Sequence, residues 1–264
     1  MNGSSDAAPQ VELRSVEVRF GSREVFHDLS CRFERHQISV VLGGSGSGKS
    51  TLLRVIGGLL NPIAGSVEID GASLVGIGSR DLARVRRRMG MLFQNGALLD
   101  SMTIFDNVAL PLREHEQLSE TEIAAAVHSR LEAVGLVDVD DLIPGELSGG
   151  MLRRAALARA IVMDPEIVLC DEPFSGLDPP NVARIEALLC RLSRERGLSF
   201  IVTSHHIPSS LRMADRLMLL EGGDAVVGTP AEFVAHEDPR VIEFLAADAD
   251  RTSLIAPGKG GELS

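Results

Sequence analysis

The sequence contains no tryptophan and no tyrosine, so nine phenylalanines supply all of its aromatic side chains. This composition argues against a nucleic-acid surface built on aromatic stacking. Basic charge is also in deficit, because 26 Lys and Arg stand against 37 Asp and Glu, which gives a formal net charge of −11. Since a phosphate backbone attracts a basic face, we expect no nucleic-acid partner.

Cysteine is scarce, and Cys31, Cys170 and Cys190 are odd in number, far apart and without a CxxC pair. Such cysteines favour a reducing compartment and free thiols buried as small apolar side chains. An apolar run of about 18 residues, as a membrane-spanning helix needs, is missing. Residues 1–10 are polar and do not resemble a signal peptide. We therefore expect a cytosolic chain that reaches a membrane only through a partner.

The 264 residues, 44% of them hydrophobic, suffice for one large domain or a domain with a subdomain. Residues 11–33 alternate apolar and polar positions, which predicts two antiparallel strands broken at Gly21-Ser22. The run "ISVVL" (38–42) is typical of a strand buried on both faces. The pattern then becomes helical from about 103 to 135 and alternates strand and helix again from Glu166. We predict an α/β core with a helical subdomain inserted at about 95–160.

A glycine-rich stretch, "GGSGSGKST", lies between the predicted strand 38–42 and a predicted helix. It matches the P-loop pattern GxxxxGK[ST] in the strand-to-helix context that the pattern requires. The backbone N–H groups of such a loop curl around phosphate oxygens, and the helix N-terminus adds positive charge. Lys49 is expected to reach the β- and γ-phosphates, and the Ser50 hydroxyl to bind Mg²⁺. The predicted nucleotide-binding residues here are Gly43, Gly44, Ser45, Gly46, Ser47, Gly48, Lys49, Ser50 and Thr51.

Polar residues follow three further buried strands of the predicted core. Asp171 ends "IVLCD", at the sheet edge where a P-loop protein binds its nucleotide, and an acid there can hold Mg²⁺. Its neighbour Glu172 can act as general base on an attacking water. His205, after "SFIVTS", is expected to orient the γ-phosphate, and Gln94, after "GMLF", to contact Mg²⁺ or water. His206 is expected to be structural.

The segment "ELSGGMLRRAALARA" places Ser148, Gly149 and Gly150 at the start of a helix. A hydroxyl and bare amides at a helix N-terminus form an anion site. The P-loop of the same chain already holds one face of the triphosphate. We therefore expect the second anion site to bind the nucleotide that is held by the P-loop of a second copy. We therefore expect two chains to enclose two ATP molecules head to tail.

Two surface segments each allow two interpretations. The arginine-rich "RDLARVRRRMG" (80–90) reads as a solvated face, with a contact to lipid headgroups as the alternative. The stretch after Gln94 mixes acids with four apolar residues expected to be exposed, and we expect it to couple the protein to a membrane partner; ordinary packing is the alternative. Those apolar residues are Leu98, Leu99, Met102 and Ile104.

In this order, the motifs resemble those of the nucleotide-binding subunit of an ATP-binding cassette (ABC) transporter. "GGSGSGKS" and "IVLCDE" are similar to Walker A and B, "LSGGM" to the signature motif and "SGLDP" to the D-loop, which implies a nucleotide contact for Asp178. Gln94 and His205 match the Q-loop glutamine and the switch histidine, and Phe20 matches the aromatic that stacks on adenine. The resemblance implies a P-loop NTPase (RecA-like) core with an N-terminal antiparallel β subdomain and an inserted helical subdomain.

Met151 departs from the commonest signature, LSGGQ, and cannot supply an amide hydrogen bond. With "LFQNGALLDSMTIFDNVALPLREHEQLSE" and "HEDPRVIEFL" it resembles the ATPases of the Mla (maintenance of outer-membrane lipid asymmetry) system, which belong to the Mce-type transporters. This resemblance implies ATP and Mg²⁺, a membrane permease, a periplasmic lipid-binding MCE protein, a small STAS-domain partner and phospholipid cargo. It places the chain on the cytoplasmic face of the bacterial inner membrane. Another ABC importer or exporter, or an ABC protein without a transport role, is the alternative.

The expected domain boundaries follow from the same patterns. The ATPase domain covers 11–246, with its core in 11–94 and 161–246. The segment that begins with "DPRVIEFL" is expected to start as a short amphipathic helix. For residues 247–264 two alternatives stay open. The tail is either disordered or, as the resemblance to the Mla group implies, wraps the neighbouring copy and docks Leu254 and Ile255 on it.

Overall fold

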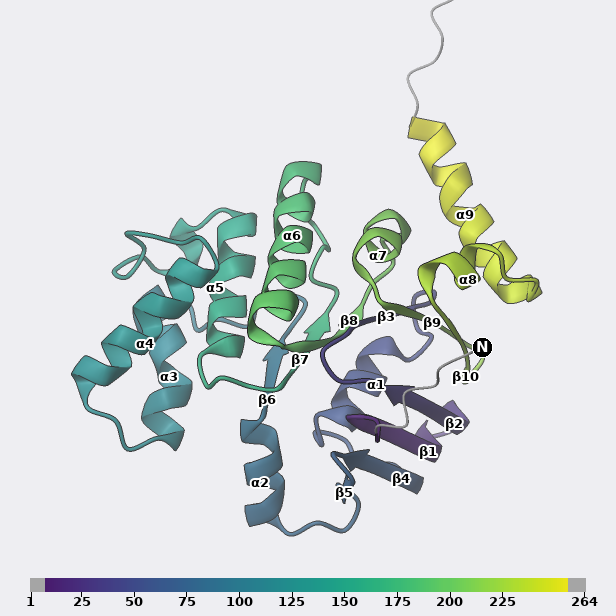
Figure 1. Cartoon of the computed structure of the whole chain (residues 1–264), viewed down its shortest axis with the longest axis horizontal. Helices are drawn as coiled ribbons and strands as arrows, with labels where there is room; N and C mark the ends of the chain where they lie inside the picture. Colours follow the sequence, from purple (N-terminus) through teal and green to yellow (C-terminus); the bar gives the residue numbers. More distant parts are fainter. Residues whose placement is uncertain (1–7, 256–264) are drawn as a thin grey trace, which may run out of the picture.

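The computed structural model describes the backbone of residues 8–255 and the side chains of residues 8–247. Its larger sheet contains β3 (Ile38–Leu42), β6 (Met89–Leu92), β7 (Ile167–Asp171), β8 (Ser199–Thr203), β9 (Arg216–Glu221) and β10 (Asp224–Gly228). The strands lie in the order β10-β9-β3-β8-β7-β6. All neighbours are parallel except the edge pair β9 and β10. The carboxyl ends of the parallel strands therefore meet at one edge of the sheet (Figure 1).

The smaller sheet is antiparallel and contains β1 (Val11–Phe20), β2 (Arg23–Phe33), β4 (Ala64–Ile69) and β5 (Ala72–Ser73). Its order is β2-β1-β4-β5. The strand pair predicted from the alternation in residues 11–33 is confirmed, with the break at Gly21-Ser22.

The helices outside the insert are α1 (Lys49–Ile56), α2 (Ser79–Arg87), α6 (Pro179–Arg196), α7 (Ile207–Met213), α8 (Pro230–Val234) and α9 (Pro239–Ile255). Helix α1 packs between the two sheets, since Leu52 and Leu53 share one core with Val41 of β3 and with β1 and β2. The alternate β3 residues Val40 and Leu42 face the second core, which includes α6. The prediction that β3 is buried on both faces is confirmed.

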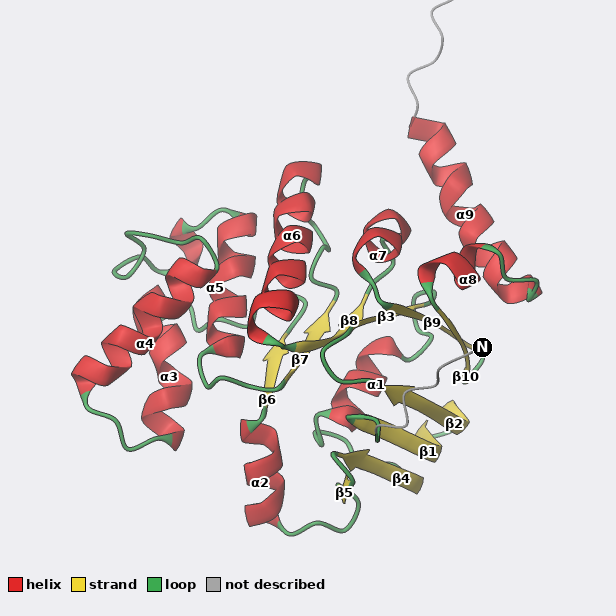
Figure 2. Cartoon of the chain, in the orientation of Figure 1, coloured by secondary structure: helices red, strands yellow, loops and turns green. Residues whose placement is uncertain are grey.

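The predicted helical insert contains α3 (Ile104–His115), α4 (Glu120–Ala133), the short 3-10 turn η1 (Pro144–Glu146) and α5 (Gly149–Ile161). Figure 2 shows these helices grouped beyond the edge strand β6. Helix α4 begins with a reciprocal cap. The Ser119 Oγ accepts a hydrogen bond from the Glu122 N–H (3.3 Å), and the Glu122 Oε2 accepts one from the Ser119 N–H (2.8 Å). Such a cap contributes about 0.5–2 kcal/mol to helix stability.

Two sequence predictions need correction. Ile104 is not exposed but fully buried as the first residue of α3. The chain is not loosely ordered directly after Ala246, because helix α9 continues to Ile255. The physical reason is local, since "AADADRTSLI" contains no glycine or proline that would stop a helix. The predicted docking of Leu254 and Ile255, and all of residues 256–264, lie outside what the structure describes.

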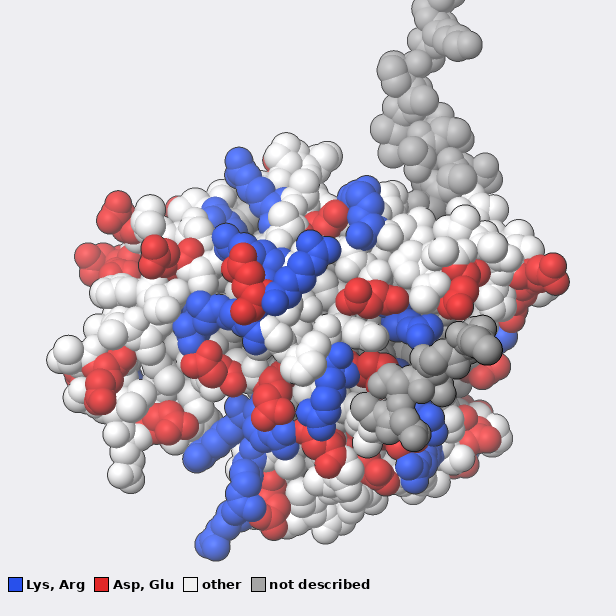
Figure 3. Space-filling view, viewed as in Figure 1, with Lys and Arg blue, Asp and Glu red and all other residues white. Residues whose placement is uncertain are grey.

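The arginine-rich segment 80–90 runs through most of α2 and into the start of β6. Arg88 contacts Glu166 (2.7 Å) and also Asp70, and Arg84 contacts Asp81 (3.0 Å). Figure 3 shows basic side chains interleaved with acidic ones over the displayed face. These ion pairs offset part of the positive charge, which supports the solvated-face interpretation. Among residues 8–255, no helix is long and apolar enough to cross a bilayer.

Candidate functional site

The P-loop joins β3 to α1, and its backbone carbonyls accept hydrogen bonds from Lys49. The Lys49 Nζ donates to the carbonyl oxygens of Gly43 (2.8 Å) and Gly44 (3.1 Å). Gly48 has a φ of 102°, and a Cβ at this position would lie 2.6 Å from the Phe26 Cε1. Only glycine fits both the backbone conformation and the space. The loop therefore presents bare backbone amides and one ammonium group, which is the chemistry that binds phosphate.

Asp171 ends β7 directly beside the P-loop helix. Its Oδ1 accepts hydrogen bonds from the Ser50 Oγ (3.0 Å) and the Thr203 Oγ1 (2.7 Å). Thr203, at the end of the neighbouring strand β8, is fully buried. The carboxylate of Asp171 is thus aimed at the start of α1, where Ser50 offers a second oxygen ligand. Hydroxyl and carboxylate oxygens are ligands that Mg²⁺ prefers.

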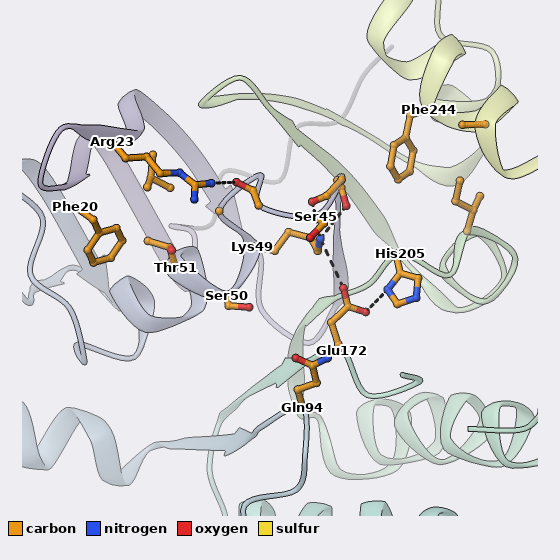
Figure 4. Close-up of a pocket in the computed structure, with 17 residues that line it drawn as sticks. Phe20, Arg23, Ser45, Lys49, Ser50, Thr51, Gln94, Glu172, His205 and Phe244 are labelled. Atoms are coloured by element: carbon orange, nitrogen blue, oxygen red, sulfur yellow. Dashed lines mark hydrogen bonds and ion pairs between the residues drawn. The ribbon is translucent and has the colours of Figure 1, made fainter. Parts of the chain in front are cut away.

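Glu172 lies between Lys49 and His205 (Figure 4). The Glu172 Oε1 is 3.6 Å from the Lys49 Nζ, and the Oε2 is 2.8 Å from the His205 Nδ1. The backbone of Glu172 is fixed by its N–H, which donates to the Thr203 Oγ1 (3.0 Å). Its φ of 48° is rare for a residue with a side chain and turns the carboxylate out of the strand. A buried carboxylate, a cation and an imidazole therefore meet at one point beside the P-loop.

A cavity of about 950 Å³ opens in front of these groups and is large enough for a nucleotide. Phe20 lies at one side of it, with 49% of its surface exposed, as an aromatic that stacks on a base requires. The cavity contains these predicted site residues: Phe20, Gly43, Gly44, Ser45, Gly46, Gly48, Lys49, Ser50, Thr51, Gln94, Glu172 and His205. Ser47 and Asp171 are absent from its lining; Asp171 nevertheless contacts the lining residue Ser50.

Sequence reasoning missed five residues of the cavity lining. Arg23 donates from its Nη2 to the Gly46 carbonyl (3.0 Å), and so braces the P-loop from β2. Val25 is also on β2, Ile207 begins α7, and Phe244 and Ala247 are on α9. These side chains carry no motif, and only their position beside the P-loop reveals them.

Ser148, Gly149 and Gly150 begin α5 as predicted but do not line this cavity. The Ser148 Oγ accepts a hydrogen bond from the Met151 N–H (3.3 Å). A Cβ at Gly150 would lie 2.3 Å from the Asn181 Oδ1, so a larger residue there would displace the Asn181 side chain of α6. Asp178, at the start of α6, accepts a hydrogen bond from the Asn181 Nδ2 and is likewise outside the cavity. A nucleotide role for these four residues stays a prediction.

The predicted coupling segment after Gln94 is only partly exposed. Leu99 is 45% exposed, whereas Leu98 packs against the core and Met102 is half-buried. The backbone of Leu99 is held by the buried Asn107, whose Oδ1 accepts from the Leu99 N–H (2.7 Å) and whose Nδ2 donates to the Leu99 carbonyl (3.0 Å). Phe93, just before Gln94, is also exposed. An anchored loop thus presents Leu99 outward.

Comparison with known proteins gives matches over most of the chain. The family model "ABC transporter" matches residues 26–175. A Haemophilus influenzae protein, "Intermembrane phospholipid transport system ATP-binding protein MlaF", is 42% identical over 241 residues, which are 91% of this chain and 91% of that protein. A Mycobacterium leprae protein, "Probable ribonucleotide transport ATP-binding protein mkl", is 38% identical over 89% of this chain and 68% of that protein.

Among solved structures, a dimeric post-hydrolysis state of the ATP-binding cassette MJ0796, bound to ADP and Pi, is similar to this chain. The TM-score is 0.76 at 30% sequence identity, and the match covers 83% of this chain and 98% of that one. The predicted fold class, an α/β P-loop core with an antiparallel sheet and a helical insert, is confirmed.

Proposed function

Since this chain belongs to the ABC transporter family, within the group of the MlaF ATP-binding proteins, we propose that it hydrolyses ATP to power phospholipid movement between the inner and outer membranes. The movement itself takes place through a separate permease and maintains outer-membrane lipid asymmetry. One observation carries the ATPase part of this proposal. Glu172 lies within 3.6 Å of the Lys49 Nζ and 2.8 Å of the His205 Nδ1, at the edge of a P-loop cavity.

The proposed reaction uses three side chains in separate roles. Lys49 binds the β- and γ-phosphate oxygens and offsets their negative charge. Glu172 accepts a proton from the attacking water, whose oxygen bonds to the γ-phosphorus while the bond from this phosphorus to the ADP oxygen breaks. The products are ADP and phosphate. His205 orients the γ-phosphate and, through its hydrogen bond, keeps the Glu172 carboxylate turned toward the cavity.

Mg²⁺ fits the oxygen groups beside the P-loop. Ser50, Asp171 and Gln94 would hold it, and the two oxygens of Ser50 and Asp171 already converge at 3.0 Å. The chemistry that the ion supplies when bound is positive charge beside the phosphate oxygens. Thr203 serves this site by keeping Asp171 oriented.

A second copy of the chain would complete each site. Ser148, Gly149 and Gly150 offer a hydroxyl and helix N-terminal amides, yet they are outside the cavity of their own chain. In the head-to-tail arrangement these groups, with Asp178, close on the ATP held by the P-loop of the partner. The dimeric state of the similar MJ0796 cassette supports this arrangement.

The remaining partners come from the resemblance to the Mla group. They are the permease, a periplasmic MCE lipid-binding protein and a small STAS-domain protein, and they would hold the chain at the cytoplasmic face of the bacterial inner membrane. The alternative is the same ATPase with another cargo. One relative, from M. leprae, supports this alternative, because its name specifies probable ribonucleotide transport rather than phospholipid transport. Purification of the chain with its native membrane partners separates the two, since only the first predicts a permease together with an MCE protein.

Lys49→Ala should weaken ATP binding about 10- to 100-fold, because a charge-assisted contact of about 1.5–3 kcal/mol is lost. Titration with a fluorescent ATP analogue measures the effect. Arg54→Ala is the matched control, because Arg54 is an exposed cation on the same helix outside the cavity. Equal affinity in Lys49→Ala and Arg54→Ala would refute the assignment of the P-loop.

Leu99→Asp should leave ATP binding intact but remove the permease, because an exposed apolar contact becomes charged on an anchored loop. Co-purification of the permease with each variant is the measurement. Val137→Asp is the control, since Val137 is an exposed apolar residue (71%) elsewhere on the insert. Retention of the permease by Leu99→Asp would favour ordinary surface exposure of this leucine.

A further inference from the structure

Helix α5 carries a buried cation, Arg153, that binds three backbone carbonyls from two other segments. Arg153 is 7% exposed. Its Nη1 donates to the carbonyl oxygens of Phe93 (3.1 Å) and Gln94, and its Nη2 donates to that of Ser175 (3.2 Å). One guanidinium therefore joins the helix that begins at Ser148 to the segment of Gln94 and to the turn after Glu172.

Burying the charged guanidinium of Arg153 carries a desolvation penalty. Packing alone therefore does not explain why an arginine occupies this position. No ion pair within residues 8–247 involves Arg153, so its charge is buried without an acid. Burial accordingly lowers the pKa of Arg153 from its ordinary value. An apolar side chain of similar length would fill the space without that penalty. What an apolar side chain lacks is the planar fork of N–H donors that can hold several carbonyls at once.

Each segment that Arg153 connects contains a residue of the proposed reaction. Gln94 lines the cavity, and the Ser175 N–H donates to the Glu172 carbonyl (3.1 Å), which ties the turn to the base. A second arginine of the same helix, Arg159, strengthens the first connection by donating to the carbonyls of Ala97 (2.7 Å) and Gly96 (2.9 Å). The segment 93–97 is thus fixed to α5 from both ends.

We infer that Arg153 is a positioning residue of the ATPase reaction, which fixes Gln94 and the turn after Glu172 relative to the helix bearing Ser148, Gly149 and Gly150. The inference rests on the proposed function. Through this connection, movement of Gln94 at the chain's own ATP displaces the anion site that faces the partner's ATP. Loss of the connection should impair closure and hydrolysis while leaving the P-loop able to bind ATP.

Arg153→Met in the full chain tests the inference, with Arg154→Met as the matched control. Arg154 is the next residue on α5 and also donates to carbonyls, but only to those of Val134 and Gly135 inside the helical insert. Arg153→Met should lower kcat per nucleotide-binding site about 10²-fold, the typical effect of misplaced reacting groups. The Kd for ATP should stay unchanged. Arg153→Lys, which keeps the charge but not the fork, should recover part of kcat.

A second readout separates positioning from mere stability. In the Glu172→Gln background, Arg153→Met should form less ATP-dependent dimer than Arg154→Met, as measured by light scattering at matched amounts of bound ATP. Equal kcat per site and equal dimer formation in the two variants would overturn the inference, as would a loss confined to the amount of folded protein. Absence of hydrolysis by the unmodified chain would instead contradict the proposed function.

Discussion

Glu172→Gln should hydrolyse ATP about 10²- to 10⁴-fold more slowly than the unmodified chain, the effect of removing a general base. Glutamine has the shape of glutamate and retains a hydrogen-bonding partner for His205, but its amide cannot take a proton from water at neutral pH. ATP binding remains, because Lys49 also bonds to the carbonyls of Gly43 and Gly44 and the P-loop stays intact. With hydrolysis slowed, the ATP-bound dimer should persist long enough to be detected.

Single-turnover hydrolysis and light scattering with ATP measure the two effects. Glu114→Gln, a change of an exposed carboxylate on α3, is the control for the loss of one negative charge. Turnover in Glu172→Gln equal to that of the control would show that the base is elsewhere.

Gly149→Asp should abolish ATP-dependent dimer formation while each P-loop still binds ATP. The change fits its own chain, because a Cβ at Gly149 would meet only the Leu177 Cδ2, at 3.7 Å, and an acid is favourable in the first turn of a helix. The defect arises only against the γ-phosphate of the partner site. Two unit charges 4 Å apart repel by about 4 kcal/mol at an effective dielectric constant of 20, or about 10³-fold in the closing equilibrium.

Gly145→Asp is the control for this variant, since Gly145 is exposed and a Cβ there would meet nothing within 4 Å. Both variants should titrate with ATP alike. Dimer formation by Gly149→Asp at the level of Gly145→Asp would mean that the anion site of α5 does not face a bound phosphate.

The sequence predicted those parts of the site that depend on local pattern. The positions of Lys49 and Ser50 follow from the glycine spacing of the P-loop pattern between a strand and a helix, and that of Asp171 follows from the apolar run that carries it to the sheet edge. The same locality explains the strands, since β3 is an apolar run and the pair β1 and β2 is an alternation of period two.

Residues that act through long-range contacts could not be predicted in this way. Thr203 orients both Asp171 and Glu172 from a neighbouring strand, and nothing in "FIVTSHH" indicates that contact. Phe244 reaches the cavity from α9, more than two hundred residues after Phe20 in the chain. The prediction that Ile104 is exposed was wrong because its exposure depends on how α3 packs within the insert. The neighbouring acidic residues in the sequence do not indicate that packing.

A mixed complex of Lys49→Ala and Gly149→Asp chains, both in the Glu172→Gln background, tests the shared ATP site most directly. In the head-to-tail dimer, both defects fall on one composite site, and the other keeps an intact P-loop facing an intact α5 N-terminus. The measurement is the radiolabelled Mg-ATP that stays with the complex during rapid gel filtration. The head-to-tail arrangement predicts that the mixed complex retains ATP and that the complex of Gly149→Asp chains alone does not. Equal loss of ATP from both complexes would contradict it.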